Sequence, residues 1–358
     1  MRKIRVKLGD RSYEVNIGSG ILAQAGYWLK ARGLAGRLIV ITNPVVSGLY
    51  GEALERSLAA GGFTVDFLEV PDGEEQKSLE TAGRLYLELE HCLAERMTPV
   101  VALGGGVIGD LAGFVAATYK RGVPLVHIPT TLLAQVDSSI GGKVAVDHGQ
   151  LKNEIGVFYQ PRLVISDIAT LKTLDAKTLG DGLAEVIKYG VIRDRGLLSY
   201  LEANMARIKA LDKPVLEKVV SRSVEIKAEV VSRDEHDLRG LRAILNYGHT
   251  IGHAIESVSG FQVGHGEAVA IGMLAAARVS REMGILSRGE LNRLESLLEK
   301  AGLPTRNPDL EVESLLSAMQ HDKKVSGGKV RFILPRELGR VFITDDVNLS
   351  LVRQVLAN

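Results

Sequence analysis

Short apolar runs alternate with longer amphipathic stretches through the first half of the chain, and this alternation restricts the fold most. Residues 37–42, 63–70, 99–103 and 125–128 have the apolar or alternating character of strands. Segments with helical spacing, such as 78–96, separate them. Strands that alternate with helices in this way form a parallel sheet covered by helices. We therefore predict an α/β, Rossmann-like domain with a parallel sheet.

The pattern changes near residue 176, where strand-like runs become scarce. Long amphipathic stretches then dominate, at 183–191, 215–232, 244–258, 267–283 and 288–301. Two strand-like runs follow near the end of the chain, at 330–334 and 340–344. A chain of 358 residues also exceeds the length that a single hydrophobic core usually supports. We therefore predict an α/β domain over residues 1–175 and a mostly α-helical domain over residues 176–358.

Composition restricts the partners and the compartment. The 44 Lys and Arg residues nearly balance the 43 Asp and Glu residues, so no excess charge favours nucleic acid or a membrane surface. Cys92 is the only cysteine and cannot form an internal disulfide, which favours a reducing compartment. No run approaches the roughly 18 apolar residues of a spanning helix, and the first residues do not have the apolar character of a signal peptide. We expect a cytoplasmic protein of enzyme size.

A glycine-rich turn follows the predicted strand 99–103. Gly104, Gly106 and Gly109 satisfy the G-x-G-x-x-G spacing, and a helix is predicted from Asp110. Glycines in such a turn allow the backbone to approach a pyrophosphate, whose charge the helix N-terminus stabilises. The next strand ends in Pro-Thr-Thr at 129–131, without the acidic residue of the standard dinucleotide fingerprint. The turn favours nucleotide binding, and a tight turn without a ligand is the alternative.

Histidines cluster in the predicted helical domain. His249 and His253 lie four residues apart on one helical face, and His265 lies at the start of the next predicted helix. Glu185 provides a carboxylate in an otherwise apolar helix, with Lys188 one turn further on. Imidazoles and a carboxylate at such positions can hold a catalytic zinc ion with one coordination position left open. The alternative is a set of hydrogen-bonded core histidines.

Taken together, these segments resemble the dehydroquinate synthase family. The resemblance extends from Asn43 to about Lys324 and follows the family's order, with matches at 72–77, 104–119, 129–143, 182–188, 241–253 and 265–267. It implies a cytoplasmic homodimer of the shikimate pathway that binds NAD and Zn2+ (or Co2+). The implied substrate is a sugar phosphate, 3-deoxy-D-arabino-heptulosonate 7-phosphate, with no nucleic acid or membrane partner.

The resemblance also implies roles for individual residues. The implied metal ligands are Glu185, His249 and His265. The implied cofactor-binding residues are Asn43, Asp72, Gly73, Glu74, Lys77, Gly106, Val107, Ile108, Gly109, Asp110, Thr130, Thr131, Lys143, Lys152, Thr170, Leu171, Lys172 and Thr173. The implied substrate-binding residues are Arg121, Asp137, Lys143, Asn153, Lys188, Lys227, Arg242, Asn246, His253 and Lys324. The implied catalytic residues are Lys143, Lys188, Asp237, Arg242 and His253. Arg121 would reach the neighbouring subunit's active site.

Two segments depart from the family pattern. Residues 146–153, interpreted as a loop, carry Asp147 where the family has asparagine and lack its usual proline and glycine before Lys152. The segment 234–240 is one residue longer than usual and offers Asp237 where a glutamate is common.

The implied reaction is a closed redox cycle. NAD oxidises the C5 hydroxyl of the substrate, phosphate is eliminated, the hydride returns, and the opened ring closes by an intramolecular aldol step. His253 would relay a proton from the oxidised hydroxyl, because imidazole titrates near neutrality. Three alternatives remain: a sister cyclase of the deoxy-inosose or valiolone type, a metal-dependent alcohol dehydrogenase, and a non-catalytic sensor of sugar phosphates or nucleotides.

Overall fold

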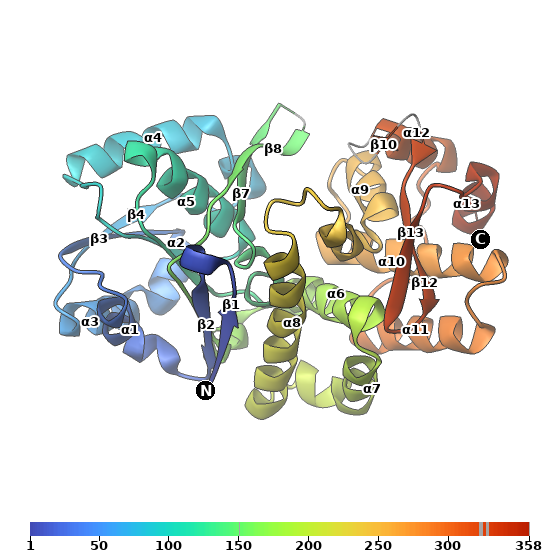
Figure 1. Ribbon diagram of the computed structural model, residues 1–358, viewed down its shortest axis with the longest axis horizontal. Coiled ribbons are helices and arrows are strands. Elements are labelled where there is room, and N and C mark those ends of the chain that lie inside the picture. The colour runs from blue at the N-terminus through green and yellow to red at the C-terminus, as the bar shows by residue number, and fades with distance from the viewer. Residues whose placement is uncertain (150, 322–324, 327–328, 358) are drawn as a thin grey trace. The chain divides into compact units, whose positions relative to one another are not determined.

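The computed structural model describes residues 1–149, 151–321, 325–326 and 329–357 (Figure 1). It divides into two compact units. The first contains Met1–Leu174 and Leu216–His236, and the second contains Asp175–Val215 and Asp237–Asn358. The predicted division at residue 175 places 216–236 in the helical domain, whereas in the structure this segment packs with the α/β unit. Within the described part of the chain, no helix combines the length and the apolar character needed to cross a membrane.

A seven-stranded sheet forms the centre of the first unit, in the order β1-β2-β9-β6-β5-β3-β4. Only β1 and β2 pair antiparallel, and every other neighbouring pair is parallel. Its strands are β1 (Arg2–Val6), β2 (Tyr13–Gly18), β3 (Arg37–Thr42), β4 (Thr64–Glu69), β5 (Val100–Gly104), β6 (Leu125–Pro129) and β9 (Leu163–Asp167). The four predicted strands match β3 to β6 to within one residue. The predicted α/β class is therefore confirmed.

Helices cover both faces of this sheet, which explains why its central strands are apolar throughout. One core contains residues of α4 (Leu79–His91) and α5 (Gly106–Thr118), and the other contains residues of α1 (Ala25–Ala31) and α3 (Glu52–Ala60). The remaining helices of the unit are the short α2 (Pro44–Val46) and α8 (Lys213–Arg233), which begins at its boundary. Two π-helical turns, η3 (Ser47–Gly51) and η6 (Ala134–Ser138), follow the carboxyl ends of β3 and β6.

Two predictions about the first unit were wrong in detail. Helix α5 begins at Gly106 and not at Asp110, because Gly105 has the extended backbone of an N-cap and its carbonyl accepts from the amide of Gly109 at 3.0 Å. Residues 146–148 end β7 (Lys143–His148) and residues 151–153 begin β8 (Leu151–Phe158) of an antiparallel hairpin, so they do not form an irregular loop. Helix α5 packs against β7, so the apolar residues of the hairpin have a partner that sequence alone did not identify.

The second unit is mostly helical, as predicted. Its helices are α6 (Ala176–Arg193), α7 (Arg195–Lys209), α9 (His249–Val258), α10 (His265–Glu282), α11 (Arg288–Ala301), α12 (Val312–His321) and α13 (Leu349–Leu356). Its strands are β10 (Val325–Ser326), β11 (Lys329–Val330), β12 (Phe332–Glu337) and β13 (Arg340–Thr344). Helix α10 is central, because it contacts α6, α9, α11, α13 and β12. Figure 1 shows it among these neighbours.

The predicted continuous helix over 244–258 was wrong. A 3-10 turn, η8 (Leu241–Asn246), ends before Gly248, whose φ of 82° interrupts the helix. A Cβ at Gly248 would lie 2.9 Å from the carbonyl oxygen of Val269, so the position needs glycine for both conformation and space. The interruption makes His249 the first residue of α9.

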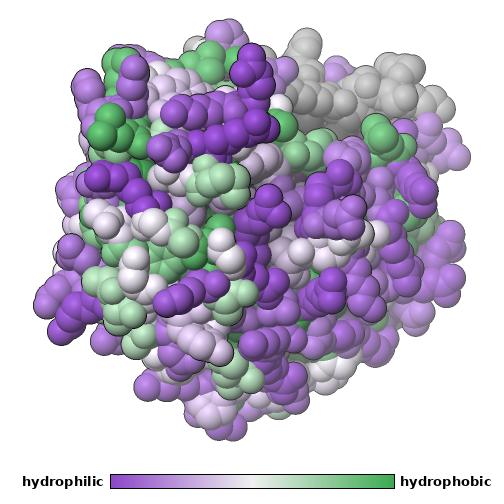
Figure 2. All heavy atoms as spheres, turned by 60° about the vertical axis from the view of Figure 1, so that its left-hand side comes forward, coloured by the Kyte–Doolittle hydropathy of each residue, from purple (hydrophilic) through white to green (hydrophobic). Residues whose placement is uncertain are grey.

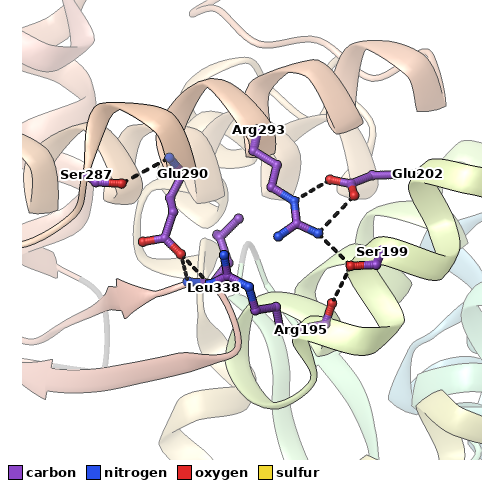
Figure 3. Close-up of polar contacts among 7 residues, drawn as sticks. All are labelled: Arg195, Ser199, Glu202, Ser287, Glu290, Arg293 and Leu338. Atoms are coloured by element: carbon purple, nitrogen blue, oxygen red, sulfur yellow. Dashed lines mark hydrogen bonds and ion pairs between the residues drawn. The ribbon is translucent and has the colours of Figure 1, made fainter.

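A polar network joins α7, α11 and the turn between β12 and β13 (Figure 3). The Arg293 guanidinium donates two hydrogen bonds to the Glu202 carboxylate, at 2.6 and 2.9 Å. Glu290 Oε1 accepts from Arg195 at 2.7 Å and from the amide of Leu338 at 3.1 Å. These contacts connect α7 to α11, and both to the β12–β13 turn.

Surface residues are mainly hydrophilic on the face drawn in Figure 2, with hydrophobic residues gathered towards its left side. Several large apolar side chains of the first unit are exposed. They include Leu87, Leu93 and Met97, which are 59%, 76% and 68% exposed. These three residues lie on α4 or in the segment that follows it.

Candidate functional site

Most of the predicted cofactor residues of the first unit follow the carboxyl ends of parallel strands, and the other two, Lys143 and Lys152, lie on the hairpin strands β7 and β8. The residues at the strand ends are considered first. They come after β3 (Asn43), β4 (72–77), β5 (106–110), β6 (130–131) and β9 (170–173). The carboxyl ends of parallel strands meet at one edge of a sheet, where ligands of open α/β sheets bind. The fold therefore brings five segments that are distant in sequence to the same edge.

Hydrogen bonds connect these segments. Asn43 caps α2 through its Oδ1, which accepts from the amide of Val46 at 2.8 Å, and its Nδ2 donates to Asp72 Oδ1 at 2.9 Å. On the other side, the Tyr50 hydroxyl donates to the carbonyl of Thr170 at 2.8 Å and lies 2.7 Å from Thr173 Oγ1. The first contact joins the end of β3 to the segment after its neighbour β4, and the second joins the segment after β3 to the segment after β9.

Gln135 joins two further strand ends. Its Nε2 donates to the carbonyl oxygens of Pro129 and Asp167, at 3.2 and 2.9 Å, and the side chain is fully buried. Sequence reasoning did not identify this residue, although it lies inside the matched segment 129–143.

Lys77 is the charged centre of this edge. It is 5% exposed, and its Nζ donates to Asp110 Oδ2 at 2.7 Å and also to the side-chain oxygen of Asn153. Burial opposes a charge on Lys77, but Asp110, Glu74 and Asp147 raise its pKa above the ordinary value. The lysine is therefore charged at neutral pH.

The unusual segment 146–153 contacts Lys77 through its backbone. The amide of Asp147 donates to the carbonyl of Lys77 at 2.7 Å, and Asp147 Oδ1 accepts from the amide of Asn153 at 2.7 Å. Asn153 has a φ of 55°, and Lys152 Nζ lies 3.7 Å from Glu74 Oε1. The hairpin thus brings four predicted ligand-binding residues together.

The glycine turn is closely packed. A Cβ at Gly104 would lie 2.8 Å from Ile108 Cβ, and a Cβ at Gly105 would lie 3.2 Å from Thr131 Cγ2. These glycines therefore allow close packing of α5 against the sheet, and none of those from Gly104 to Gly109 needs a left-handed φ. Among the residues that the structure describes, no side chain caps the N-terminus of α5, so its first amides face the strand-end edge uncapped. The turn supports both a packing role and a ligand-binding role.

Glu185, His249 and His265 form a compact group in the second unit. Their candidate ligand atoms all lie within 4.8 Å of one another. Glu185 comes from the middle of α6, and the two histidines are the first residues of α9 and α10. Glu185 Oε1 lies 3.5 Å from His249 Nε2 and 3.7 Å from His265 Nε2.

The donor set of this group suits a divalent metal. Glu185 is 1% exposed and forms an ion pair with Lys188, but among the described residues no donor makes a hydrogen bond of good geometry to either carboxylate oxygen. A buried carboxylate oxygen without hydrogen bonds requires an explanation. One carboxylate and two imidazole nitrogens are a three-ligand set that zinc accepts in catalytic sites. The residues present therefore fit the predicted metal.

The two histidines have different environments. His249 Nδ1 lies 3.2 Å from the carbonyl oxygen of Tyr247, and the His253 ring packs edge-on at a centroid distance of 5.3 Å. Burial alone would lower the pKa of His265, but Glu185 and Glu256 raise it to about 10. A metal cation would have to displace that proton, so metal binding should release protons.

The first unit also carries residues predicted to bind the substrate. Lys227 is 6% exposed, and its Nζ donates to the carbonyl oxygen of Asp137 at 2.8 Å and pairs with Asp137 Oδ1 at 2.8 Å. Lys143 is exposed at the start of β7, with its Nζ 5.8 Å from the centroid of the Phe158 ring. Arg121 is exposed and has a φ of 65°.

In the second unit, Lys188 and Arg242 are 2% and 3% exposed. Asn246 ends η8, and Asp237 has a φ of 57° in the turn after α8. Lys324 lies outside the described residues. The roles predicted for these residues stay predictions.

Sequence reasoning missed two carboxylates beside the metal group. Glu256 Oε1 lies 3.4 Å from His265 Nδ1, and Asp181 Oδ1 accepts from the amide of Gly266 at 2.8 Å. Burial raises the pKa of Asp181. In each case the sequence offered one signal, a carboxylate within an otherwise apolar helical segment. Glu256 lies three residues after His253, and Asp181 lies four residues before Glu185.

Solved structures share this two-unit fold. A 2-epi-5-epi-valiolone synthase from Streptomyces hygroscopicus subsp. jinggangensis 5008, with NAD+ and Zn2+ bound, matches with a TM-score of 0.90 and 28% identity, covering 100% of this chain and 98% of the other. A 2-deoxy-scyllo-inosose synthase complexed with carbaglucose-6-phosphate, NAD+ and Co2+ matches with a TM-score of 0.87 and 27% identity, covering 99% of both chains. The fold is thus that of the sugar-phosphate cyclases.

Family models define the relationship more closely. Residues 67–181 match the N-terminal model of 3-dehydroquinate synthase, and residues 182–325 match the C-terminal model. A 3-dehydroquinate synthase from Dehalococcoides mccartyi is 51% identical over 356 residues, covering 99% of each chain. The chain belongs to the 3-dehydroquinate synthase family.

Proposed function

We propose that this chain converts 3-deoxy-D-arabino-heptulosonate 7-phosphate to 3-dehydroquinate and phosphate, as a lyase of the shikimate pathway in the cytoplasm. The observation that carries the proposal is the group of Glu185, His249 and His265, in a chain that is 51% identical to a 3-dehydroquinate synthase over nearly its full length. The absence of a spanning helix among the described residues is consistent with this compartment.

The proposed cofactors are NAD and Zn2+ (or Co2+). The matched valiolone synthase was solved with NAD+ and Zn2+, and the inosose synthase with NAD+ and Co2+. Glu185, His249 and His265 would hold the metal, and the residues at the strand ends would hold the dinucleotide. When bound, the metal would polarise a substrate hydroxyl as a Lewis acid, and NAD would take and return a hydride.

Side chains of the chain itself would bind and orient the substrate. Arg242 and Lys188 are buried cations in the helical unit, where arginine is suited to bidentate binding of a carboxylate or phosphate. Lys227 and Lys143 are further cations that the resemblance assigns to substrate binding. A rigidly held substrate matters because the last step is intramolecular, and orientation can contribute about 7–11 kcal/mol to such a step.

His253 is the proposed proton relay. Its ring lies beside that of His249, so it is close to the metal group without being one of the three grouped residues. A neutral imidazole can accept the proton of a hydroxyl near neutral pH. The resemblance alone supports Asp237 as the acid/base partner of His253.

The alternatives are less well supported. Identity to the valiolone and inosose synthases is 28% and 27%, against 51% to the 3-dehydroquinate synthase. A simple alcohol dehydrogenase would have no evident use for the two buried cations Lys188 and Arg242. A sensor without catalysis would not need three ligands with an open fourth position.

The decisive experiment follows phosphate and NADH together. Purified protein is mixed with the heptulosonate phosphate, NAD and zinc, and glucose 6-phosphate replaces the substrate in a parallel sample. We expect phosphate release from the heptulosonate alone, with no accumulation of NADH and with complete loss after chelation. Stoichiometric NADH would indicate a dehydrogenase, and turnover of the hexose phosphate would indicate a sister cyclase.

A homodimer is also proposed, with Arg121 acting in the neighbouring active site. Lys120, Arg121 and Gly122 have consecutive positive φ values of 48°, 65° and 112°, a costly backbone for the first two. Lys120 Nζ donates to the carbonyl of Ala94 at 2.6 Å, which places this turn against the exposed Leu93. Exposed apolar side chains beside a strained, charged turn favour a subunit interface.

Complementation between inactive variants tests the shared site. Arg121→Ala and Glu185→Gln should each be inactive as homodimers. If Arg121 acts in the neighbouring site, a mixed dimer regains one complete site, because the Glu185→Gln subunit donates its arginine to the Arg121→Ala subunit. Recovery of activity after mixing and subunit exchange is the expected result. No recovery in a verified mixed dimer would contradict the proposal.

A further inference from the structure

Each candidate histidine ligand directs one ring nitrogen towards Glu185 and the other towards an acceptor. The Nε2 atoms of His249 and His265 lie 3.5 and 3.7 Å from Glu185 Oε1. On the opposite side of each ring, His249 Nδ1 lies 3.2 Å from the carbonyl oxygen of Tyr247, and His265 Nδ1 lies 3.4 Å from Glu256 Oε1. A carbonyl oxygen thus orients one imidazole, and a buried carboxylate faces the other.

We propose that Glu256 is a positioning residue for His265. Its carboxylate accepts the Nδ1–H of the imidazole, and this fixes the tautomer in which Nε2 carries the lone pair for the metal. Metal-bound histidines usually donate their second ring N–H to a carboxylate or carbonyl oxygen, which orients the ring and raises its basicity as a ligand. The inference rests on the proposed metal at Glu185, His249 and His265.

Close packing of α9 and α10 produces this contact. A Cβ at Gly272 would lie 2.0 Å from the carbonyl oxygen of Gly248, and a Cβ at Gly252 would lie 3.2 Å from that of Ala268. Glu256 lies one turn after Gly252 on α9, on the same face. The helices are thus close enough for a glutamate side chain to reach His265 at the start of α10.

The backbone at His265 is held separately. Asp181 Oδ1 accepts from the amide of Gly266 at 2.8 Å, and a Cβ at Gly266 would lie 2.3 Å from Asp181 Cα. Asp181 lies one turn before Glu185 on α6, so the same helix carries a proposed ligand and fixes the backbone beside another. The contact with Asp181 does not determine the rotation or the tautomer of the His265 ring. Glu256 restricts both.

Burial makes this carboxylate suited to the task. Glu256 is 7% exposed, and a carboxylate so far removed from water is costly unless it has a partner. A charged acceptor also forms stronger hydrogen bonds than a neutral one. The hydrogen-bond acceptor that faces His265 is therefore stronger than the carbonyl oxygen that faces His249.

Zinc affinity of the purified protein is the first test. Wild type, Glu256→Ala and Glu256→Gln are titrated with zinc against a chromophoric chelator. Loss of such an outer partner commonly weakens metal binding by about 10–100-fold, so Glu256→Ala should show a loss in this range. Glu256→Gln should lose clearly less, because its side-chain oxygen can still accept from Nδ1–H.

Glu267→Gln is the matched control. Glu267 lies in the first turn of α10, two residues after His265, and its carboxylate accepts from the amide of Gly264 at 2.9 Å. Like Glu256→Gln, this substitution removes one carboxylate charge, here from the turn that carries His265, and it can keep the hydrogen bond to Gly264. Its zinc affinity should stay close to that of wild type.

The second readout is the ring proton itself. In zinc-loaded, 15N-labelled protein, the Nδ1 proton of His265 should give a downfield resonance protected from exchange with water. It should persist in Glu256→Gln and be lost to exchange in Glu256→Ala, a change that a purely structural role for Glu256 would not produce. Activity at saturating zinc is recorded for comparison.

The outcomes separate this inference from the proposed function. If wild type neither binds zinc nor releases phosphate, the proposed function fails. If wild type does both while Glu256→Ala keeps wild-type zinc affinity and a protected Nδ1 proton, the positioning role is overturned. Should Glu256→Ala not fold, absence of the protected proton in both wild type and Glu256→Gln overturns it equally.

Discussion

Lys77 and Asp110 form an ion pair of 2.7 Å in the interior of the α/β unit, with their side chains 5% and 18% exposed. The lysine follows β4, and the aspartate lies in the first turns of α5, so the pair joins two of the segments proposed to bind the dinucleotide. A second bond from Lys77 to Asn153 extends the connection to the hairpin. The buried Lys77 thus connects three parts of this edge: the segment after β4, the start of α5 and the hairpin.

Lys77→Met should destabilise the protein strongly, because it leaves Asp110 buried without its cation. Breaking a buried pair by removing one partner typically costs about 3–5 kcal/mol. Removing the other charge as well, in Lys77→Met/Asp110→Asn, should recover a large part of that loss. Urea unfolding of the two single variants and the double variant measures the coupling. Additive losses would show that the pair is not coupled.

Gly113→Ala should destabilise the α/β unit although alanine favours helices. A Cβ at Gly113 would lie 2.4 Å from Val144 Cγ1, a buried branched side chain on β7. Overpacking costs about 1–3 kcal/mol, which exceeds the gain of up to about 1 kcal/mol from helix propensity. Val144→Ala in the same chain should relieve the clash.

Gly83→Ala is the matched control for this prediction. Gly83 lies within α4, and a Cβ there would meet nothing within 4 Å. The same substitution should therefore stabilise the protein by about 0.5–1 kcal/mol. Equal shifts in the denaturation midpoints of the two variants would contradict the packing argument.

Hydrophobic periodicity predicted many of the strands and helices, and the features that it missed depend on contacts between segments that are distant in sequence. Strands β3 to β6 are central, buried and apolar, so periodicity identified them to within one residue. The hairpin β7–β8 carries polar residues and packs against α5, a contact that sequence does not show, so the segment 146–153 was interpreted as a loop. The break at Gly248 was missed because a single glycine is compatible with a helix, and only the structure shows its φ of 82° and its close approach to the backbone of Val269.

The candidate metal group was predicted more completely than its surroundings. Histidine is rare in this chain, with eight residues, so the clustering of three of them gave a strong local signal. Glu256 and Asp181 belong to a common residue type, and their function depends on which helices pack together. Spacing within one helix cannot reveal that Glu256 on α9 faces His265 on α10.

His249→Ala should weaken zinc binding by at least about 100-fold, since it removes one of three proposed ligands from the protein. Phosphate release should fall with it and should not be restored by moderate excess zinc. His91→Ala, which removes an exposed histidine on α4, is the control and should bind zinc like wild type. Unchanged zinc affinity in His249→Ala would remove this residue from the proposed site.

Acid should weaken the fold partly through His127, a buried histidine on β6 that is not one of the proposed site residues. Burial lowers the pKa of His127 to about 4, against 6.5 for an exposed histidine. As pH falls below 6.5, the unfolded chain binds a proton at this position that the folded chain does not bind until pH 4. Stability should therefore fall between these two values, by about 3 kcal/mol in total.

His127→Gln tests the sign and the size of this effect, because glutamine has a similar volume and does not titrate. Urea unfolding is measured at intervals from pH 7 to pH 4 for wild type, His127→Gln and His91→Gln. The slope of unfolding free energy against pH should be shallower in His127→Gln only, and His91→Gln is the control at an exposed position on α4. Parallel slopes for wild type and His127→Gln would show that His127 binds its proton equally in the folded and unfolded chain.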